Sequence, residues 1–539
     1  MRGGEYILPW TYLHVIKDYV DMAAHLEAQP EARAVVNFAP ILLEQIEDYS
    51  NQVSAFLQNR TEIKDALLHA LVATSLPAEA DFRFKILKDC QKANRERQIY
   101  RYPAFRHLIE MADWLQAHAD AINYVNEQFL FDTLVWYHLA WMGESVKLND
   151  ARIIRLIEKA HQFSLHDRLE LMEVIDDLLS KVIYRYKALA KKGRIELAVS
   201  PYAHPIMPLM LDINSACEAL PEVTLPTLAH YPGGEQRVHW HLQKGIAIFK
   251  HFFGSHPQGC WPSEGGLSEK TLRTLSDFGF KWTATGENVL HNSLLACAET
   301  QSLHQAFKLQ NTDIACFFRD DGLSDLIGFE YSKWHADDAV TDFIQHLENI
   351  AGLTGPDSIV SIIMDGENAW EYFPDNGYHF LTSLYKRLAD HPHLQLTTFS
   401  DYLDKVHDIA VLPKLVAGSW VYGTFSTWIG DADKNCGWDM LGDIKACFDK
   451  VVAEGRLSEQ QLAVAEKQLA ICEGSDWFWW FGDYNPGEAV SDFEKQYRLN
   501  LTNLYRLLGE EPPAYLALAF TQGSGAPAMG GAMRRGNET

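Results

Sequence analysis

The stretch Lys191-Lys192-Gly193-Arg194-Ile195-Glu196-Leu197-Ala198-Val199 joins the end of a long helical pattern to a short apolar run. Before it, from Leu169 to Tyr186, apolar residues recur every three or four positions, which is the spacing of an amphipathic helix. Two lysines and a glycine are typical of a helix C-terminus. Ile195 to Val199 has the length and composition of a buried strand. This step from helix to strand is the unit from which we predict the fold.

The same alternation recurs along the chain. Ala34 to Phe38 is an earlier apolar run that ends before Pro40, and from there to about residue 192 the pattern is helical. Further strands are predicted near Cys260-Trp261 and at Lys281 to Thr285, Ile314 to Phe318, Ile359 to Met364 and Leu396 to Phe399. Such alternation predicts an α/β fold with a mostly parallel sheet, open or closed as a barrel. After about residue 405 the pattern is helical again, and residues 522–539 are predicted to form a disordered tail.

Length, charge and cysteine usage exclude several classes of protein. A chain of 539 residues is too long for one hydrophobic core, so we expect a large domain and at least one appended domain. A net charge of −25 argues against nucleic-acid and anionic-membrane partners, but not against a neutral sugar polymer. The eight cysteines contain no C-x-x-C pair, the N-terminus is too polar for a signal peptide, and no apolar run has the length of a membrane helix. These features predict a cytoplasmic protein without a cofactor, and they leave the oligomeric state open.

Two motifs place carboxylates at turns next to predicted strands. Asp365 follows the apolar strand that ends at Met364 and opens the run Asp365-Gly366-Glu367-Asn368. Glu264 lies in Trp261-Pro262-Ser263-Glu264-Gly265, on a tight turn before a helix predicted to start near Ser268. Polar residues that end such strands lie on the face where active sites form. Taken alone, each carboxylate is equally compatible with a turn or a helix cap. Together they supply the two carboxyl groups that glycoside hydrolysis requires.

Other polar and aromatic residues are candidates for sugar contacts. Glu196 and the run Pro201-Tyr202-Ala203-His204-Pro205 form a third cluster, although a lone histidine is more often structural. The chain has 15 tryptophans, whose flat rings can stack on sugars. Most tryptophans in any protein belong to the core, so we expect two or three to contact a ligand, from the set Trp261, Trp334, Trp420, Trp428, Trp477, Trp479 and Trp480.

These motifs, in this order, resemble glycoside hydrolase family 57, the retaining α-glucan enzymes that include α-amylases, amylopullulanases, branching enzymes and 4-α-glucanotransferases. The segments 193–205, 261–265 and 364–368 are similar to the family's second, third and fourth conserved regions. The segment 419–439 is similar to a later aromatic region, and 473–483 to a C-terminal signature of the longer, amylopullulanase-like members. The resemblance runs from about Tyr6 to Leu518.

The resemblance implies a fold, a substrate and a set of site residues. The fold would be an incomplete (β/α)7 barrel over residues 1–405, with a helical insertion at about 40–192, followed by a helical C-terminal domain at 406–521. Glu264 would be the nucleophile and Asp365 the general acid/base, acting on an α-glucan or maltooligosaccharide without a metal. The residues expected to contact the substrate are Glu196, Tyr202, His204, Trp261, Glu367, Trp370, Trp420, Trp428, Asp476 and Trp477.

One departure from the family pattern leaves alternatives open. A first strand ending in a His-Gln-Pro type motif should precede Glu5-Tyr6, and the sequence starts at Met1, too late to contain it. We expect the native start to lie further upstream. A glucan-binding homologue that has lost turnover is the first alternative. A metal-dependent sugar deacetylase or α-mannosidase-like enzyme is the second, although the sequence contains no compact set of metal ligands.

Overall fold

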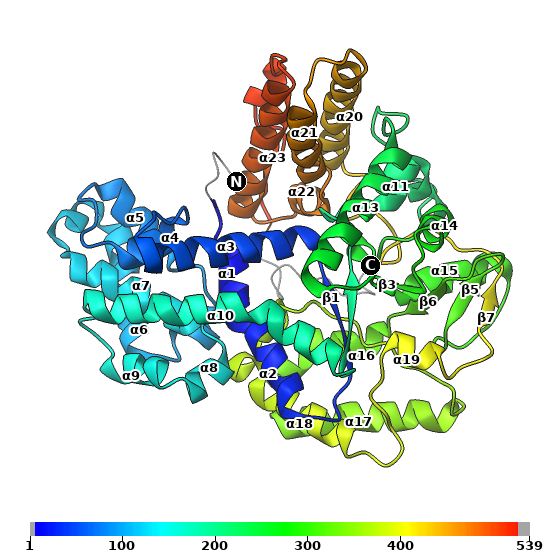
Figure 1. Cartoon of the computed structure of the whole chain (residues 1–539), viewed down its shortest axis with the longest axis horizontal. Helices are drawn as coiled ribbons and strands as arrows, with labels where there is room; N and C mark the ends of the chain where they lie inside the picture. The colour runs from blue at the N-terminus through cyan, green and yellow to red at the C-terminus, as the bar shows by residue number, and fades with distance from the viewer. Residues whose placement is uncertain (1–5, 526–539) are drawn as a thin grey trace.

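A seven-stranded sheet organises the computed structural model of the chain, which describes residues 6–525 (Figure 1). Its order is β1-β2-β3-β4-β6-β5-β7, and every neighbouring pair is parallel except β5 and β6. Val36 pairs with Leu197 and Thr283 pairs with Cys316. The strands are β1 (Ala34–Phe38), β2 (Ile195–Val199), β3 (Gly259–Cys260), β4 (Trp282–Thr285), β5 (Phe307–Leu309), β6 (Ala315–Phe318) and β7 (Ala410–Leu412).

The structure confirms the mixed α/β class and the mostly parallel sheet, but it does not confirm a barrel. Within residues 6–525, β1 and β7 are the two edges of the sheet, and no strand pairing joins them. β5 and β7 are short strands that the sequence analysis missed. The predicted strands that became β1, β2, β3, β4 and β6 are confirmed within a residue or two.

Two predicted strands are wrong. Residues 359–364 make only one bridge, between Ser361 and Arg319 of the segment after β6. Side chains occupy backbone groups that a neighbouring strand would otherwise pair, because Arg319 Nε donates to the Ile363 carbonyl at 2.8 Å and Ser324 Oγ accepts from the Ile363 N–H at 3.3 Å. Residues 396–399 are not a strand because Thr398 caps a helix that starts at Phe399.

Helices fill the long connection between β1 and β2, as predicted. The longest, α10, begins after a capping box formed by Ser164 and Asp167. These side chains satisfy backbone N–H groups that the first helical turn leaves unpaired. The helices before β2 are α1 (Trp10–His14), α2 (Val20–Ala28), α3 (Pro40–Asn59), α4 (Ala66–Val72), α5 (Ala80–Asp89), α6 (Pro103–Ala117), α7 (Glu127–Trp141), α8 (Glu144–Asn149), α9 (Ala151–Lys159) and α10 (Leu165–Lys191), with a π-helical turn at Val15–Tyr19.

The second half adds helices around the sheet and a group at the C-terminal end. Around the sheet lie α11 (Met207–Leu211), α12 (Ala216–Ala219), α13 (Gly234–Phe253), α14 (Glu269–Asp277), α15 (Glu287–Cys297), α16 (Asp321–Asp325), α17 (Ala336–Leu353), α18 (Tyr378–Ala389) and α19 (Phe399–Leu403). The last group, at the top of Figure 1, is α20 (Ala432–Ala453), α21 (Glu459–Cys472), α22 (Ser475–Trp480) and α23 (Gly487–Leu507).

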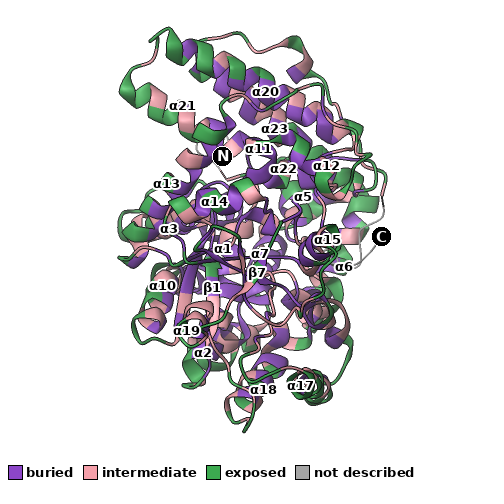
Figure 2. Cartoon of the chain, turned by 90° about the vertical axis from the view of Figure 1, so that its right-hand side faces the viewer, coloured by how far each residue is buried: buried purple, intermediate pink, exposed green. Residues whose placement is uncertain are grey.

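Buried residues are concentrated in the interior, where the sheet meets its surrounding helices, and exposed residues lie on outer faces such as that of α17 (Figure 2). None of the helices within residues 6–525 combines the length and apolarity needed to cross a membrane. Of the predicted tail, residues 526–539 lie outside the described part. Residues 522–525 are described, and there the backbone N–H groups of Ser524 and Gly525 donate to the carbonyls of Asp483 and Asn485.

A buried ionic network ties the C-terminal helices to α13. Glu473, at the end of α21, accepts hydrogen bonds from Arg237 Nη2 and His241 Nε2, both at 2.8 Å, and from the Tyr231 hydroxyl at 2.6 Å. Burial alone would raise the pKa of Glu473, but the Arg237 charge and the His241 hydrogen bond lower it to about 2. The network therefore fixes the residues that directly follow Glu473.

Replacing Glu473 with glutamine should destabilise the protein by about 3–5 kcal/mol, because it leaves the Arg237 charge buried without a counterion. The depressed pKa means that the stabilisation by Glu473 is present above about pH 4.5 and is lost as the pH falls towards 2. Urea unfolding at pH 7 and at pH 4 tests both statements. Glu510→Gln, which breaks an exposed pair with Arg456, is the matched control and should leave stability unchanged. Equal effects of the two substitutions would contradict the argument.

Candidate active site

Glu264 is presented by a strained turn at the C-terminal end of β3. The short 3₁₀ turn Ser263–Gly265 holds Glu264 at a φ of 58°, in the left-handed region that non-glycine residues rarely adopt. Gly265, at a φ of 60°, lies against two tryptophans, and a Cβ atom there would approach Trp261 to 3.1 Å and Trp420 to 3.3 Å. Thr285 Oγ1 at the end of β4 donates to the Gly265 carbonyl at 2.5 Å. The surroundings thus impose this backbone conformation, which presents the carboxylate in one fixed place.

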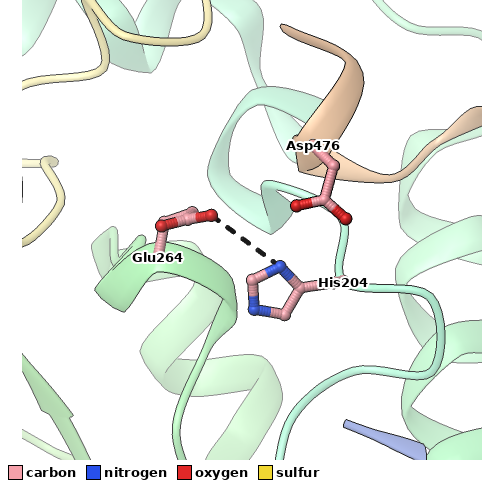
Figure 3. A group of neighbouring side chains, drawn as sticks. All are labelled: His204, Glu264 and Asp476. Atoms are coloured by element: carbon pink, nitrogen blue, oxygen red, sulfur yellow. Dashed lines mark ion pairs between the residues drawn. The ribbon is translucent and has the colours of Figure 1, made fainter. Parts of the chain in front are cut away.

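The Glu264 carboxylate is held by residues from three other segments. Trp420 Nε1 donates to Oε2 at 3.1 Å, and Ser475 Oγ donates to Oε1 at 3.3 Å. His204 Nδ1 lies 3.9 Å from Oε1 and 2.9 Å from Ser475 Oγ. Figure 3 shows His204 on a loop, Glu264 on its short turn and Asp476 on a separate segment, with a dashed line between His204 and Glu264. Residues far apart in the sequence therefore converge on one acidic group.

Asp365 is held from the side of β6. Asn368 Nδ2 donates to Asp365 Oδ2 at 3.0 Å. Arg319, the residue after β6, contacts the segment that leads to Asp365 through its bond to the Ile363 carbonyl, and its guanidinium lies 5.6 Å from the centre of the Trp420 ring. Because Trp420 donates to Glu264, Arg319 and Trp420 together connect the surroundings of the two carboxylates.

The electrostatics of the site favour a retained proton. Burial and the charges of Asp476 and Asp365 raise the pKa of Glu264 to about 8. Burial also raises the pKa of Asp365, against the opposing effects of Asn368, Arg319 and His204. Burial lowers the pKa of His204, which favours the neutral imidazole. These shifts favour retention of a proton by the two carboxyl groups.

The structure brings five of the other predicted site residues near this pair. His204 and Asp476 face Glu264, and the rings of Trp261 and Trp420 meet edge-on at 5.4 Å. Glu367 follows Asp365 by two residues and accepts a short hydrogen bond from the Tyr19 hydroxyl. Burial is the largest cause of the raised pKa of Glu367, and the charges of Asp365 and Asp18 raise it further. Glu367 therefore belongs to the same acidic region.

The other predicted sugar contacts are placed elsewhere or are covered. Glu196 lies in the first half of β2, away from the strand end that leads to His204, and it accepts bonds from Trp282 Nε1 and from Ser400. Tyr202 and Trp428 are fully buried, and the Tyr202 hydroxyl donates to Glu44 at 2.6 Å. Trp370 is buried beside Phe373, and Trp477 packs its ring against Tyr497. Tyr202, Trp370 and Trp428 therefore offer little or no surface to a ligand, whereas Glu196 and Trp477 are half-buried.

Sequence reasoning missed Arg319, Ser475 and Tyr19. Arg319 directly follows β6, so the rule that selected polar residues at strand ends would have found it. Ser475 precedes the selected Asp476 at the start of α22, and no pattern in the sequence distinguishes it. Tyr19 lies in an N-terminal helical segment whose relation to residue 367 depends on the whole fold.

One group of side chains has the composition of a metal site. The ligand atoms of His204, Glu264 and Asp476 lie within 4.8 Å of one another. However, both oxygens of Glu264 already accept hydrogen bonds, from Trp420 and Ser475, and Asp476 is exposed. The donor set therefore fits a carboxylate positioned by hydrogen bonds better than a closed metal centre.

Comparisons with known proteins point to one family. The family model of glycosyl hydrolase family 57 matches residues 1–413. Among solved structures, a branching enzyme from Thermococcus kodakaraensis has a TM-score of 0.55 at 14% identity, and one from Pyrococcus horikoshii has 0.54 at 16%; both alignments cover 92% of this chain and 85% of that chain. The α-amylase AmyC from Thermotoga maritima has a TM-score of 0.55 at 12% identity, covering 93% and 88%. At these identities the likeness shows the fold alone. No curated protein matches the chain.

Proposed function

The chain belongs to glycosyl hydrolase family 57, and from this premise we propose that it cleaves or transfers α-glucan chains by a retaining mechanism. In this proposal Glu264 attacks the anomeric carbon while Asp365 protonates the leaving sugar oxygen, which gives a covalent glycosyl-enzyme. Asp365 then activates water for hydrolysis, or an acceptor hydroxyl for transfer.

One observation carries the proposal. The charge of Asp365 raises the pKa of Glu264 although the two residues are distant in sequence, so both carboxyl groups belong to one partly buried site, and burial raises the pKa of both. Two carboxyl groups in one site supply a nucleophile and a proton donor, the two components of the first step, and the attack requires that Glu264 first loses its proton. Trp261 and Trp420 stand beside this pair and supply ring faces next to Glu264.

We also propose that the chain consists of two parts with different roles. Residues 1–405 would form the catalytic part, with its helical insertion at about 40–192, and 406–521 a helical C-terminal domain. The support is the placement of Ser475 and Asp476, which reach Glu264 from α22. The C-terminal helices would then complete the site and not merely cover it.

The direct test is product analysis by chromatography after incubation with maltoheptaose. Glucose and maltose would indicate hydrolysis, and chains longer than the substrate would indicate transfer. Absence of any product, from chains shown to be folded by circular dichroism, would contradict the proposal and favour a glucan-binding protein without turnover.

A metal-dependent sugar enzyme is the second candidate, because His204, Glu264 and Asp476 approach one another closely. Preincubation with EDTA separates the two readings. The carboxylate mechanism predicts unchanged maltoheptaose turnover after EDTA, whereas a metal-activated water predicts a loss that added Zn²⁺ restores.

Replacing Asp476 with asparagine should move the alkaline limb of the kcat/KM pH profile to lower pH. The charge of Asp476 raises the pKa of Glu264 and of Asp365, so its removal lets the shared proton leave at a lower pH. Because Asp476 is exposed, added salt should reduce the difference between variant and parent. Asp492→Asn, an exposed carboxylate on α23, is the control, and an equal shift there would contradict the assignment.

A further inference from the structure

An open groove lies on the helices between β1 and β2, away from the carboxylate pair. Helix α6 and the 3₁₀ turn Ala119–Tyr124 border an open groove of about 670 Å³, within the roughly 300–1,000 Å³ that is typical of ligand pockets. Figure 1 places α6 in the helical group to the left of the view, on the opposite side of the molecule from α15 and β7. None of the residues that line this groove belongs to the site around Glu264.

Aromatic side chains form an exposed platform in the groove. Trp114 is 55% exposed, Tyr124 is 90% exposed and Met111 is 52% exposed, although large apolar side chains are usually covered. The Trp114 ring is stacked on the His118 imidazole, with 4.4 Å between centres and 18° between planes, and His118 Nδ1 is hydrogen-bonded to the Trp114 carbonyl at 2.9 Å. The indole is therefore held flat before any ligand arrives.

Polar groups line the same groove without giving it a net charge. His107 and Glu110 lie on the face of α6 that carries Met111 and Trp114, at helical spacings of three and four. Glu110 Oε1 accepts from Arg106 Nε at 2.7 Å, so the two charges cancel. Flat rings beside hydrogen-bonding groups, with no net charge, match a pyranose, which offers an apolar C–H face and a rim of hydroxyl groups.

The groove is too small for a stable contact with a second copy of the chain. Three partly exposed large side chains offer roughly 300–500 Å² of apolar surface, at about 150–250 Å² for a whole aromatic side chain. A specific protein interface needs about 800 Å² from each partner. Two ion pairs, Arg106–Glu110 and Arg95–Asp113, also flank the groove, so charged side chains surround its apolar surface. A concave, neutral, aromatic groove of this size is suited to a few sugar rings.

We propose that this groove binds a segment of an α-glucan chain, and so holds the polymer at a distance from the carboxylates that act on it. The identity of the polymer rests on the function proposed above. The consequence is a difference between substrates: long chains reach both places at once and gain effective concentration at the active site, whereas a short oligosaccharide does not.

Affinity electrophoresis in gels that contain glycogen tests the proposal. The double variant Trp114→Ala/Tyr124→Ala should bind glycogen at least fivefold more weakly than the parent, with a raised KM for glycogen. Its kcat/KM for maltoheptaose should stay within twofold of the parent, because neither residue lies near Glu264. Tyr184→Ala, which removes an exposed tyrosine of α10, is the matched control and should behave like the parent. Thermal melting checks that both variants are folded.

The outcomes separate this proposal from the proposed function. Glycogen binding that depends on Trp114 and Tyr124, in a protein without turnover, would leave the groove assignment standing and overturn the enzyme assignment. Turnover with glycogen binding that the double variant leaves unchanged would overturn the groove alone, and so would a parent that glycogen does not retard. Sedimentation that shows a dimer lost in the double variant, with glycogen binding unchanged, would also overturn it and assign the patch to self-association.

Discussion

Replacing Glu264 with glutamine is expected to lower kcat for maltoheptaose by roughly 10³-fold or more, because an amide cannot form the covalent bond to the anomeric carbon. The side chain keeps its shape. One oxygen still accepts the bond from Trp420 Nε1, and the Ser475 hydroxyl can turn to accept from the new NH₂ group. The loss would therefore report chemistry and not a collapsed site. Stopped assays with chromatographic detection measure it.

The same variant should be more stable than the parent at neutral pH. The pKa of Glu264 is raised from 4.5 to about 8, so folding costs free energy wherever the unfolded chain is ionised. This cost is absent below about pH 4.5, grows as the pH rises towards 8, and amounts to roughly 3 kcal/mol at pH 7. Thermal melting at pH 5 and pH 8 should show a difference that widens with pH.

Glu269→Gln provides the matched control for Glu264. Glu269 lies at the start of α14, outside the site, and its half-buried carboxylate pairs with Arg273 and accepts from the Leu415 N–H at 3.3 Å. Activity within about twofold of the parent is expected there. Undiminished turnover in the Glu264 variant would remove the proposed mechanism, whatever its stability.

Replacing Asp365 with asparagine is expected to lower maltoheptaose turnover by about 10²–10⁴-fold, the usual size of a general acid/base contribution. A substrate with a better leaving group then separates the role of Asp365 from that of Glu264. An aryl α-maltoside with an acidic phenol needs no proton to leave, so formation of the glycosyl-enzyme should survive in the Asp365 variant and be lost in the Glu264 variant. A burst of phenol followed by slow turnover is the expected signature.

The contrary result is equally specific. If the Asp365 variant releases no burst of phenol from the aryl substrate, then Asp365 does not act as the proton donor of the first step. Asn368→Ala is a useful companion, because it removes the hydrogen bond to Asp365 Oδ2 and leaves both carboxylates in place. This substitution should change the pH profile of turnover more than it changes the ratio of the rates on the aryl substrate and on maltoheptaose.

Much of the fold could be predicted because strand and helix patterns are local. β1, β2 and α10 follow apolar runs and helical spacing that neighbours in sequence determine. The segment 359–364 has the same apolar composition, yet its backbone bonds are taken by Arg319 and Ser324, which no local pattern reveals. The three-residue strands β5 and β7 were missed because so short a run carries no periodicity.

The residues of the candidate site, too, could be predicted only where the signal is local in sequence. Glu264 and Asp365 could be selected because each stands beside a turn and an apolar run. Glu196 was selected for its neighbours in sequence, but alternation along β2 and its distance from the strand end direct it to Trp282 and Ser400. Tyr202 and Trp428 have suitable chemistry for sugar contacts and are covered by tertiary packing. Residue type identified candidates, and only packing decided their exposure.

The contact between Ser475 and Glu264 spans 211 positions of the chain and has a consequence for biosynthesis. A ribosome releases the turn that carries Glu264 long before the segment that carries Ser475, and the N-terminal part of a chain generally folds first. The nascent protein therefore holds its acidic group without this hydrogen-bond donor until the segment that carries Ser475 has been made. Activity of the proposed kind should begin only after synthesis has passed α22 and this helix has docked.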